Sequence, residues 1–114
     1  MITANFIIES DGFIKKVSVK GHAGFDEYGY DIICSGVSTL LISTINALEE
    51  YVGLNTMVTL EEGYTNFEIS PMTEVQRIQS DALVQSLLLA FEGLSEEYED
   101  FVEVNIQEEE NDSL

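Results

Sequence analysis

Basic residues are scarce in this 114-residue chain, which has four lysines and arginines against 22 aspartates and glutamates. A surface this acidic repels the phosphates of a nucleic-acid backbone. The formal net charge of −18 therefore argues against direct nucleic-acid binding and favours a basic protein or peptide as the partner. Composition alone leaves a second explanation open, in which the charge only keeps a small protein soluble.

Cysteine and histidine each occur once, and tryptophan is missing. A single cysteine forms no internal disulfide, which fits a reducing compartment and predicts a cytoplasmic location. The start MITANFIIESDGF has no basic segment ahead of an apolar one, and no apolar run approaches the roughly 20 residues of a membrane helix, so we expect neither export nor a membrane partner. One cysteine and one histidine also leave a zinc site two ligands short, so no metal or other cofactor is expected.

Alternating apolar residues predict five strands. Residues 2–8 and 13–19 alternate around a Ser-Asp-Gly turn, although Lys15 interrupts the apolar face. A second hairpin is predicted for residues 56–60 and 64–69, around Glu61-Glu62-Gly63. A short closing strand near residues 101–106 completes the set.

Apolar residues at helical spacing predict two helices. The first covers residues 33–51 and ends at Gly53, and the second begins with the capping-box pair Thr73 and Gln76 and continues to Leu94. Together these elements predict an α+β fold, with two helices packed on a mainly antiparallel sheet in the order ββαββα(β). The length corresponds to one domain, over residues 1–107, followed by an acidic tail at residues 108–114.

The single histidine and the single cysteine lie in one stretch, GHAGFDEYGYDIICSG, between the second strand and the first helix. His22 at a strand end and Cys34 in the first helical turn are on rigid elements that can meet, across a loop hinged at Gly21, Gly24 and Gly29. Free N–H groups at a helix start favour thiolate over thiol, and a neighbouring imidazole supplies the base that a cysteine nucleophile needs. The alternative is a packing cysteine near a surface histidine.

Residues beside this pair are given supporting roles. Asp31 is expected to cap the helix by accepting the N–H of Ile33 or Cys34, a role favoured over orienting His22. Ser38 lies one turn after the cysteine, where it contacts the thiolate or a substrate, or serves as a small packing residue. Three loop aromatics are expected to form an apolar lid on the substrate rather than only an anchor into the core: Phe25, Tyr28 and Tyr30.

The motifs G-H-A-G and Y-D-I-I-C-S-G-V-S resemble those of the ribosomal-processing cysteine proteases called Prp. Between Gly21 and Ser38 the residues themselves match the pattern of the family. Over the rest of the chain the resemblance is in length, acidic character and the order of helices and strands. It implies a cysteine protease domain in which His22 and Cys34 form a catalytic dyad, with Asp31 and Ser38 as further family features. Ser-Gly follows the cysteine where the family commonly has alanines, a departure that does not touch the dyad.

This resemblance implies a bacterial endopeptidase, homodimeric and needed for ribosome assembly. It removes the N-terminal extension of ribosomal large-subunit protein twenty-seven, cutting after an aromatic residue, and such a basic precursor suits an acidic enzyme. In the implied acyl transfer Cys34 attacks the carbonyl and His22 moves the proton, and we expect amides of the first helical turn to hold the oxyanion.

The residues alone leave two other functions open. One is a non-catalytic acidic module that binds a basic ribosomal or ribosome-assembly partner, with an inert thiol. The other, ranked last, is a thiol redox sensor, which lacks a resolving cysteine in this chain.

Overall fold

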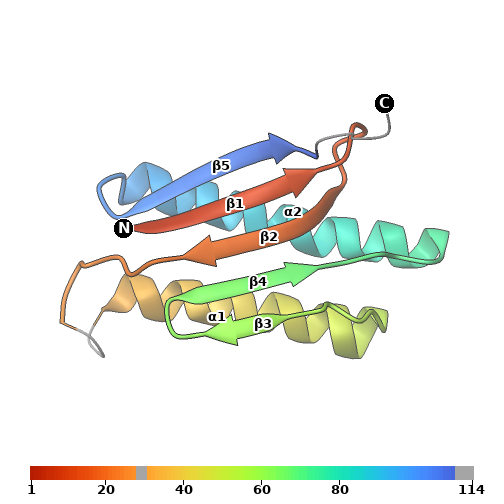
Figure 1. The fold of residues 1–114 in the computed structure, drawn as a ribbon, viewed down its shortest axis with the longest axis horizontal. Helices are drawn as coiled ribbons and strands as arrows, with labels where there is room; N and C mark the ends of the chain where they lie inside the picture. Colours follow the sequence, from red (N-terminus) through yellow and green to blue (C-terminus); the bar gives the residue numbers. More distant parts are fainter. Residues whose placement is uncertain (28–30, 110–114) are drawn as a thin grey trace.

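The computed structural model of the protein describes residues 1–27 and 31–109 as a sheet with two helices covering one face (Figure 1). The strands lie in the order β3-β4-β2-β1-β5. The predicted fold class and the order ββαββα(β) are confirmed. The elements are β1 (Ile2–Ile8), β2 (Ile14–Lys20), α1 (Ile32–Asn46), η1 (Ala47–Val52), β3 (Thr59–Glu61), β4 (Tyr64–Glu68), α2 (Glu74–Glu97) and β5 (Val102–Glu108).

The sheet is antiparallel except for one pair, because β5 runs parallel to β1. The helix α2 carries the chain back along the sheet, so β5 starts at the same end as β1, and Ile2 lies opposite Val102. The Ile2 N–H also donates to the Phe101 carbonyl at 2.8 Å. The start of β1, the start of β5 and the end of β2 therefore meet at one end of the sheet (Figure 1).

The core lies between the sheet and the two helices. Alternate β1 residues face inward, with Ala4 opposite Val19 and Phe6 opposite Val17. Phe6 also meets Phe91 of α2 edge-on, with ring centroids 5.8 Å apart. Burying one such side chain stabilises the fold by about 1.5–3 kcal/mol, so the core fixes the strand ends that carry the site. The innermost large side chains are Phe6, Phe67, Phe91, Ile2, Ile14 and Leu48.

The first predicted helix divides into two parts. The segment α1 is α-helical, but η1 is a π-helical turn that ends where predicted, at Gly53 in the left-handed conformation. By length and composition alone, the continuous helix Ile32–Val52 is apolar enough to cross a membrane, a test that core helices of globular domains also pass. Here its stripe of Ile33, Val37, Leu41 and Ile45 is buried against the sheet.

The third strand is shorter than predicted. It begins at Thr59 instead of residue 56. The Thr56 side chain is buried and its hydroxyl donates to the Glu49 carboxylate at 2.6 Å, while Met57 has a φ of 49° that is incompatible with a strand. The prediction of a strand over residues 56–60 was therefore wrong at its start. The Thr56 carbonyl still accepts the Glu68 N–H of β4 at 2.8 Å, but its side chain is bound to η1, and the positive φ of Met57 interrupts the strand.

The last strand extends through Glu108, the first residue assigned to the predicted acidic tail. The next residue, Glu109, donates its N–H to the Ile8 carbonyl at 2.8 Å, and its carboxylate pairs with Lys15. The sheet thus contains the first residue of that segment and binds the second. The remainder of the predicted tail, residues 110–114, lies outside the described residues.

Candidate active site

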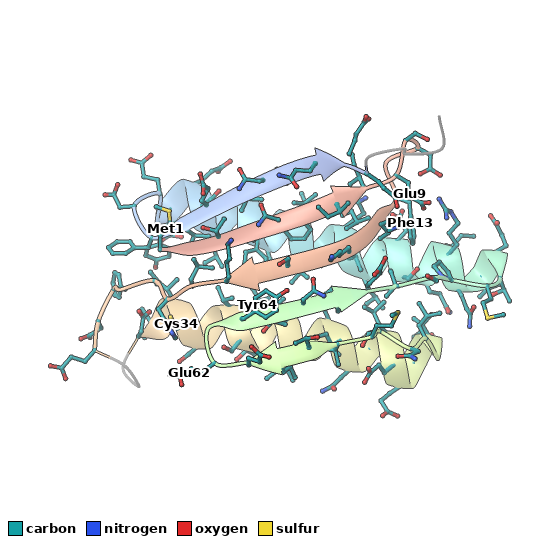
Figure 2. The ribbon with its side chains drawn as sticks, viewed as in Figure 1. Met1, Glu9, Phe13, Cys34, Glu62 and Tyr64 are labelled. Carbon is teal, nitrogen blue, oxygen red and sulfur yellow. The ribbon has the colours of Figure 1, made fainter. Side chains whose placement is uncertain are left out.

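The structure brings His22 and Cys34 to the same end of the sheet. His22 lies two residues after the end of β2, with Gly21 between them, and Cys34 is the third residue of α1. The turn between β3 and β4 lies beside them, and Figure 2 shows Cys34, Glu62 and Tyr64 together at this end, with Glu9 and Phe13 at the opposite end. Both His22 and Cys34 line the same two cavities, so the two predicted reactive side chains share one site.

The two cavities share this pair and Ser38 but are otherwise lined by different residues. The smaller, about 260 Å³, has an apolar wall and carboxylates at its rim; it is lined by Ile2, Val19, Val37, Leu41, Glu61, Glu62 and Tyr64, among others. The larger, about 610 Å³, is lined by Gly24, Asp26, Asp31, Ser35 and Thr39, together with the shared residues His22, Cys34 and Ser38. A peptide bound at the pair would therefore have two cavities that can take its side chains.

Asp31 caps α1, as the sequence predicted. Its Oδ1 accepts the N–H of Ile33 and of Cys34, both at 3.0 Å, and its Oδ2 accepts the N–H of Phe25 at 3.0 Å. Only 6% of the residue is exposed. Burial acts to raise the pKa of Asp31, but hydrogen bonds from the Cys34 and Phe25 N–H groups, the Cys34 thiol and the Ile33 N–H outweigh it, and the pKa is lowered. One carboxylate thus ties the loop to the start of the cysteine's helix.

Replacing Asp31 with alanine is expected to lower the free energy of unfolding by about 1 kcal/mol at neutral pH, the usual loss for a helix cap. The effect depends on pH: because folding lowers the Asp31 pKa below its ordinary value of 3.8, its stabilisation is present above that value and is lost as pH falls through the folded-state pKa. Urea unfolding between pH 7 and 3 measures both. Asp26→Ala, at an exposed carboxylate that accepts the next N–H, is the matched control, and equal losses in the two variants would contradict the cap.

The Cys34 sulfur receives a backbone donor that the sequence did not indicate. The Ala23 N–H donates to Cys34 Sγ at 3.3 Å, from the residue that directly follows His22. The thiol is half-buried, so it remains accessible to a substrate. The hydrogen bond fixes the strand end against the helix start and supplies a dipole that stabilises a thiolate.

The prediction that first-turn amides hold the oxyanion was wrong for three of these amides. Those of Ile33 and Cys34 donate to the Asp31 carboxylate, and that of Ser35 donates to the Asp31 carbonyl at 3.1 Å. An amide bound to its own cap does not point at a substrate oxygen. The capping role therefore excludes the oxyanion role for the same N–H groups in this conformation.

Of the three predicted lid aromatics, the structure describes Phe25. Phe25 packs edge-on against Tyr98 and Phe101, with ring centroids at 5.9 and 5.3 Å, where α2 joins β5. Phe25 therefore anchors the loop in this conformation, although it is 42% exposed, and its role in a lid stays a prediction. Residues 28–30, with the predicted lid residues Tyr28 and Tyr30 and the hinge Gly29, lie outside the described residues. The other two hinge glycines have φ of +97° and +70°, which favours glycine there.

Sequence reasoning missed the contribution of the β3–β4 turn. Glu61, Glu62 and Gly63 indicated only a hairpin, but all three line the smaller cavity. No local signal places a turn next to a histidine some forty residues earlier, because that proximity depends on β4 pairing with β2. Within residues 1–27 and 31–109, no three side chains of His, Cys, Asp or Glu gather to hold a metal ion.

Comparison with known proteins gives one consistent family. The family model described as "Cysteine protease Prp" matches residues 1–103. The ribosomal processing cysteine protease Prp of Staphylococcus aureus is 26% identical over 105 residues, which are 92% of this chain and 98% of that protein. The protein of the same name from Bacillus subtilis is 27% identical over 107 residues, 91% of this chain and 96% of its own length.

Solved structures agree with the fold over nearly the whole chain. SMU.848 from Streptococcus mutans is 34% identical, with a TM-score of 0.83 and coverage of 96% of both chains. The essential ribosomal processing protease Prp from S. aureus, in complex with a covalently linked product peptide, is 24% identical with a TM-score of 0.84, covering 94% of this chain and all of that chain. These similarities extend over the elements that carry His22 and Cys34.

Proposed function

The chain belongs to the Prp family of ribosomal processing cysteine proteases, and we propose that Cys34 and His22 are its catalytic dyad. One observation carries this assignment: the only cysteine and the only histidine of the chain line the same two cavities, with the cysteine in the first turn of α1. The S. aureus relative was solved in complex with a covalently linked product peptide.

In this mechanism Cys34 Sγ attacks the carbonyl carbon of the scissile bond, and its proton passes to His22. His22 then protonates the leaving amine as the C–N bond breaks, and water hydrolyses the thioester to release the acid and the free cysteine. The Ala23 N–H, 3.3 Å from the sulfur, stabilises the thiolate before attack. Asp31 holds the first turn of α1 and so fixes the position of the nucleophile.

The substrate is the precursor of ribosomal large-subunit protein twenty-seven, from which the enzyme removes the N-terminal extension by cutting after an aromatic residue. The smaller cavity supports this assignment, because its wall of Ile2, Val19, Val37 and Leu41 offers an apolar surface to an aromatic ring beside Cys34. The net charge of −18 supports a basic precursor, which electrostatic attraction steers toward the enzyme. A cytoplasmic location, where ribosomes are assembled, belongs to the same proposal.

Incubating the protein with the full-length precursor and following intact masses tests this function. We expect one cut, directly after an aromatic residue near the N-terminus. A precursor in which that aromatic is replaced by aspartate is the matched control, because a carboxylate loses its hydration in an apolar cavity, and cleavage is expected to fall at least about 100-fold. Equal cleavage of the two substrates would contradict the aromatic preference while leaving the protease assignment intact.

A homodimer is part of the proposal, formed through the helix face that points away from the sheet. Residues 32–48, which form α1 and the start of η1, carry no charge in a chain with 22 acidic residues. On α2, Val75, Ile78 and Leu89 are 62%, 61% and 69% exposed, at the spacing of one helical stripe. Two chains this acidic repel each other over most of their surface, so an uncharged apolar face is where self-association is favourable.

Leu89→Glu is expected to weaken this dimer at least about 100-fold, because it places an unpaired charge in an apolar interface. Sedimentation equilibrium across a concentration series measures the dissociation constant. Leu60→Glu, a matched change at a leucine 59% exposed on the edge strand β3, is expected to have little effect. Dissociation by Leu60→Glu but not by Leu89→Glu would assign the interface to the sheet edge instead.

A further inference from the structure

The turn between β3 and β4 touches the imidazole of His22. Gly63 is the second residue of the Glu62-Gly63 turn. A Cβ on Gly63 would lie 3.0 Å from His22 Nε2 and 3.6 Å from both Cδ2 and Cε1. These three distances mean that the ring edge lies directly against the space that a Cβ would occupy. The turn therefore lies beside the imidazole, and a residue with a Cβ at position 63 would press on the ring.

Backbone contacts fix the position of this turn relative to His22. The Gly21 N–H donates to the Gly63 carbonyl at 2.8 Å, and the register pairs Lys20 with Tyr64. The residue before His22 and the residue that faces its ring are thus joined by one hydrogen bond. A shift of the turn would shift the end of β2 as well, so the turn and the residue that carries the imidazole move together.

We infer that Gly63 is a positioning residue for His22, an inference that rests on the proposed dyad. It leaves open the space beside the imidazole edge, and it has no side chain that would displace the ring from its place beside Cys34. The position also requires glycine for a second reason, because its φ is +71°. Experiment can separate the contact with the imidazole from the positive φ, because other glycines of the chain have a positive φ without such a contact.

Gly63→Ala and Gly12→Ala form a matched pair. Gly12 also lies in a hairpin turn, with φ of +91°, but nothing lies within 4 Å of a Cβ there, and its turn is at the opposite end of the sheet, where Figure 2 labels Glu9 and Phe13. Both variants have the same kind of backbone strain, and only Gly63→Ala presses on the imidazole. Because a misplacement of 1 Å costs about 100-fold in rate, a displacement of a few tenths of an ångström is expected to lower kcat about tenfold in Gly63→Ala, with KM little changed.

The single histidine gives a readout that is independent of activity. The chain has one His, so its Cε1–H resonance in the proton NMR spectrum reports the surroundings of this imidazole alone. We expect this resonance to move in Gly63→Ala but not in Gly12→Ala. The remaining dispersed resonances verify that each variant is folded. If Gly63→Ala does not fold, Gly63→Asn replaces it, because asparagine tolerates a positive φ but still has a Cβ.

Two failures are distinguishable. If His22→Ala cleaves the precursor at the wild-type rate, the dyad itself is wrong. If His22→Ala is inactive while Gly63→Ala and Gly12→Ala share the wild-type kcat and imidazole resonance, the dyad stands and the positioning role of Gly63 is overturned. A tenfold lower kcat in Gly63→Ala, together with a displaced imidazole resonance, establishes that role.

Discussion

Cys34→Ala is expected to lower the rate of precursor cleavage at least about a thousandfold, since removal of the nucleophile leaves only binding and orientation. No other thiol can substitute, because the chain has one cysteine. The change removes a half-buried sulfur that accepts the Ala23 N–H, so a small loss of stability accompanies it. Intact-mass time courses on the same precursor measure the rate, and thermal unfolding verifies the fold.

A matched control and a binding measurement complete the test. Ser43→Ala makes a comparable truncation at an exposed position of the same helix and is expected to cleave at the wild-type rate. Cys34→Ala is expected to bind the precursor within about twofold of the wild type, because the lost atom acts mainly in the transition state. Cleavage by the variant would remove Cys34 from the mechanism. Binding of the precursor without cleavage by either protein would favour the acidic binding module.

The local parts of the site were predictable from the sequence. Asp31 caps the helix because a carboxylate placed just before a helix start is in reach of its first N–H groups, a geometry fixed by neighbouring residues. The capping box of Thr73 and Gln76 is confirmed for the same reason. The placement of His22 at a strand end and Cys34 in a first helical turn followed from the periodicity on either side of the loop.

The parts that depend on distant contacts were not predictable. The parallel pairing of β5 with β1 is fixed by the return path of α2, which local alternation does not record. The proximity of Gly63 to His22 depends on that sheet register as well. From the sequence, Phe25 was expected in a lid because its loop is rich in aromatic residues. Its ring contacts with Tyr98 and Phe101 depend on the fold, which brings these distant residues beside the loop.

Gly21→Ala is expected to lower the free energy of unfolding by about 3 kcal/mol or more, the sum of overpacking and a left-handed backbone. A Cβ on Gly21 would lie 2.2 Å from the Met1 carbonyl oxygen, and φ there is +97°. The carbonyl cannot easily move away, because it shares a planar peptide with the Ile2 N–H, which is bound to the Phe101 carbonyl at 2.8 Å. If Gly21 moves instead, its own hydrogen bond to Gly63 breaks and His22 moves with it.

Gly24→Ala separates the clash from the backbone strain. Gly24 lies in the same loop with φ of +70°, and nothing lies within 4 Å of a Cβ there, so the expected loss is only about 1 kcal/mol. Urea unfolding measures both variants, and precursor cleavage below the unfolding transition is expected to fall for Gly21→Ala far more than for Gly24→Ala. Equal stability of the two would show that the chain start yields to the methyl group. A stable Gly21→Ala with full activity would mean that the junction of Met1, Gly21 and Gly63 does not hold His22 in place.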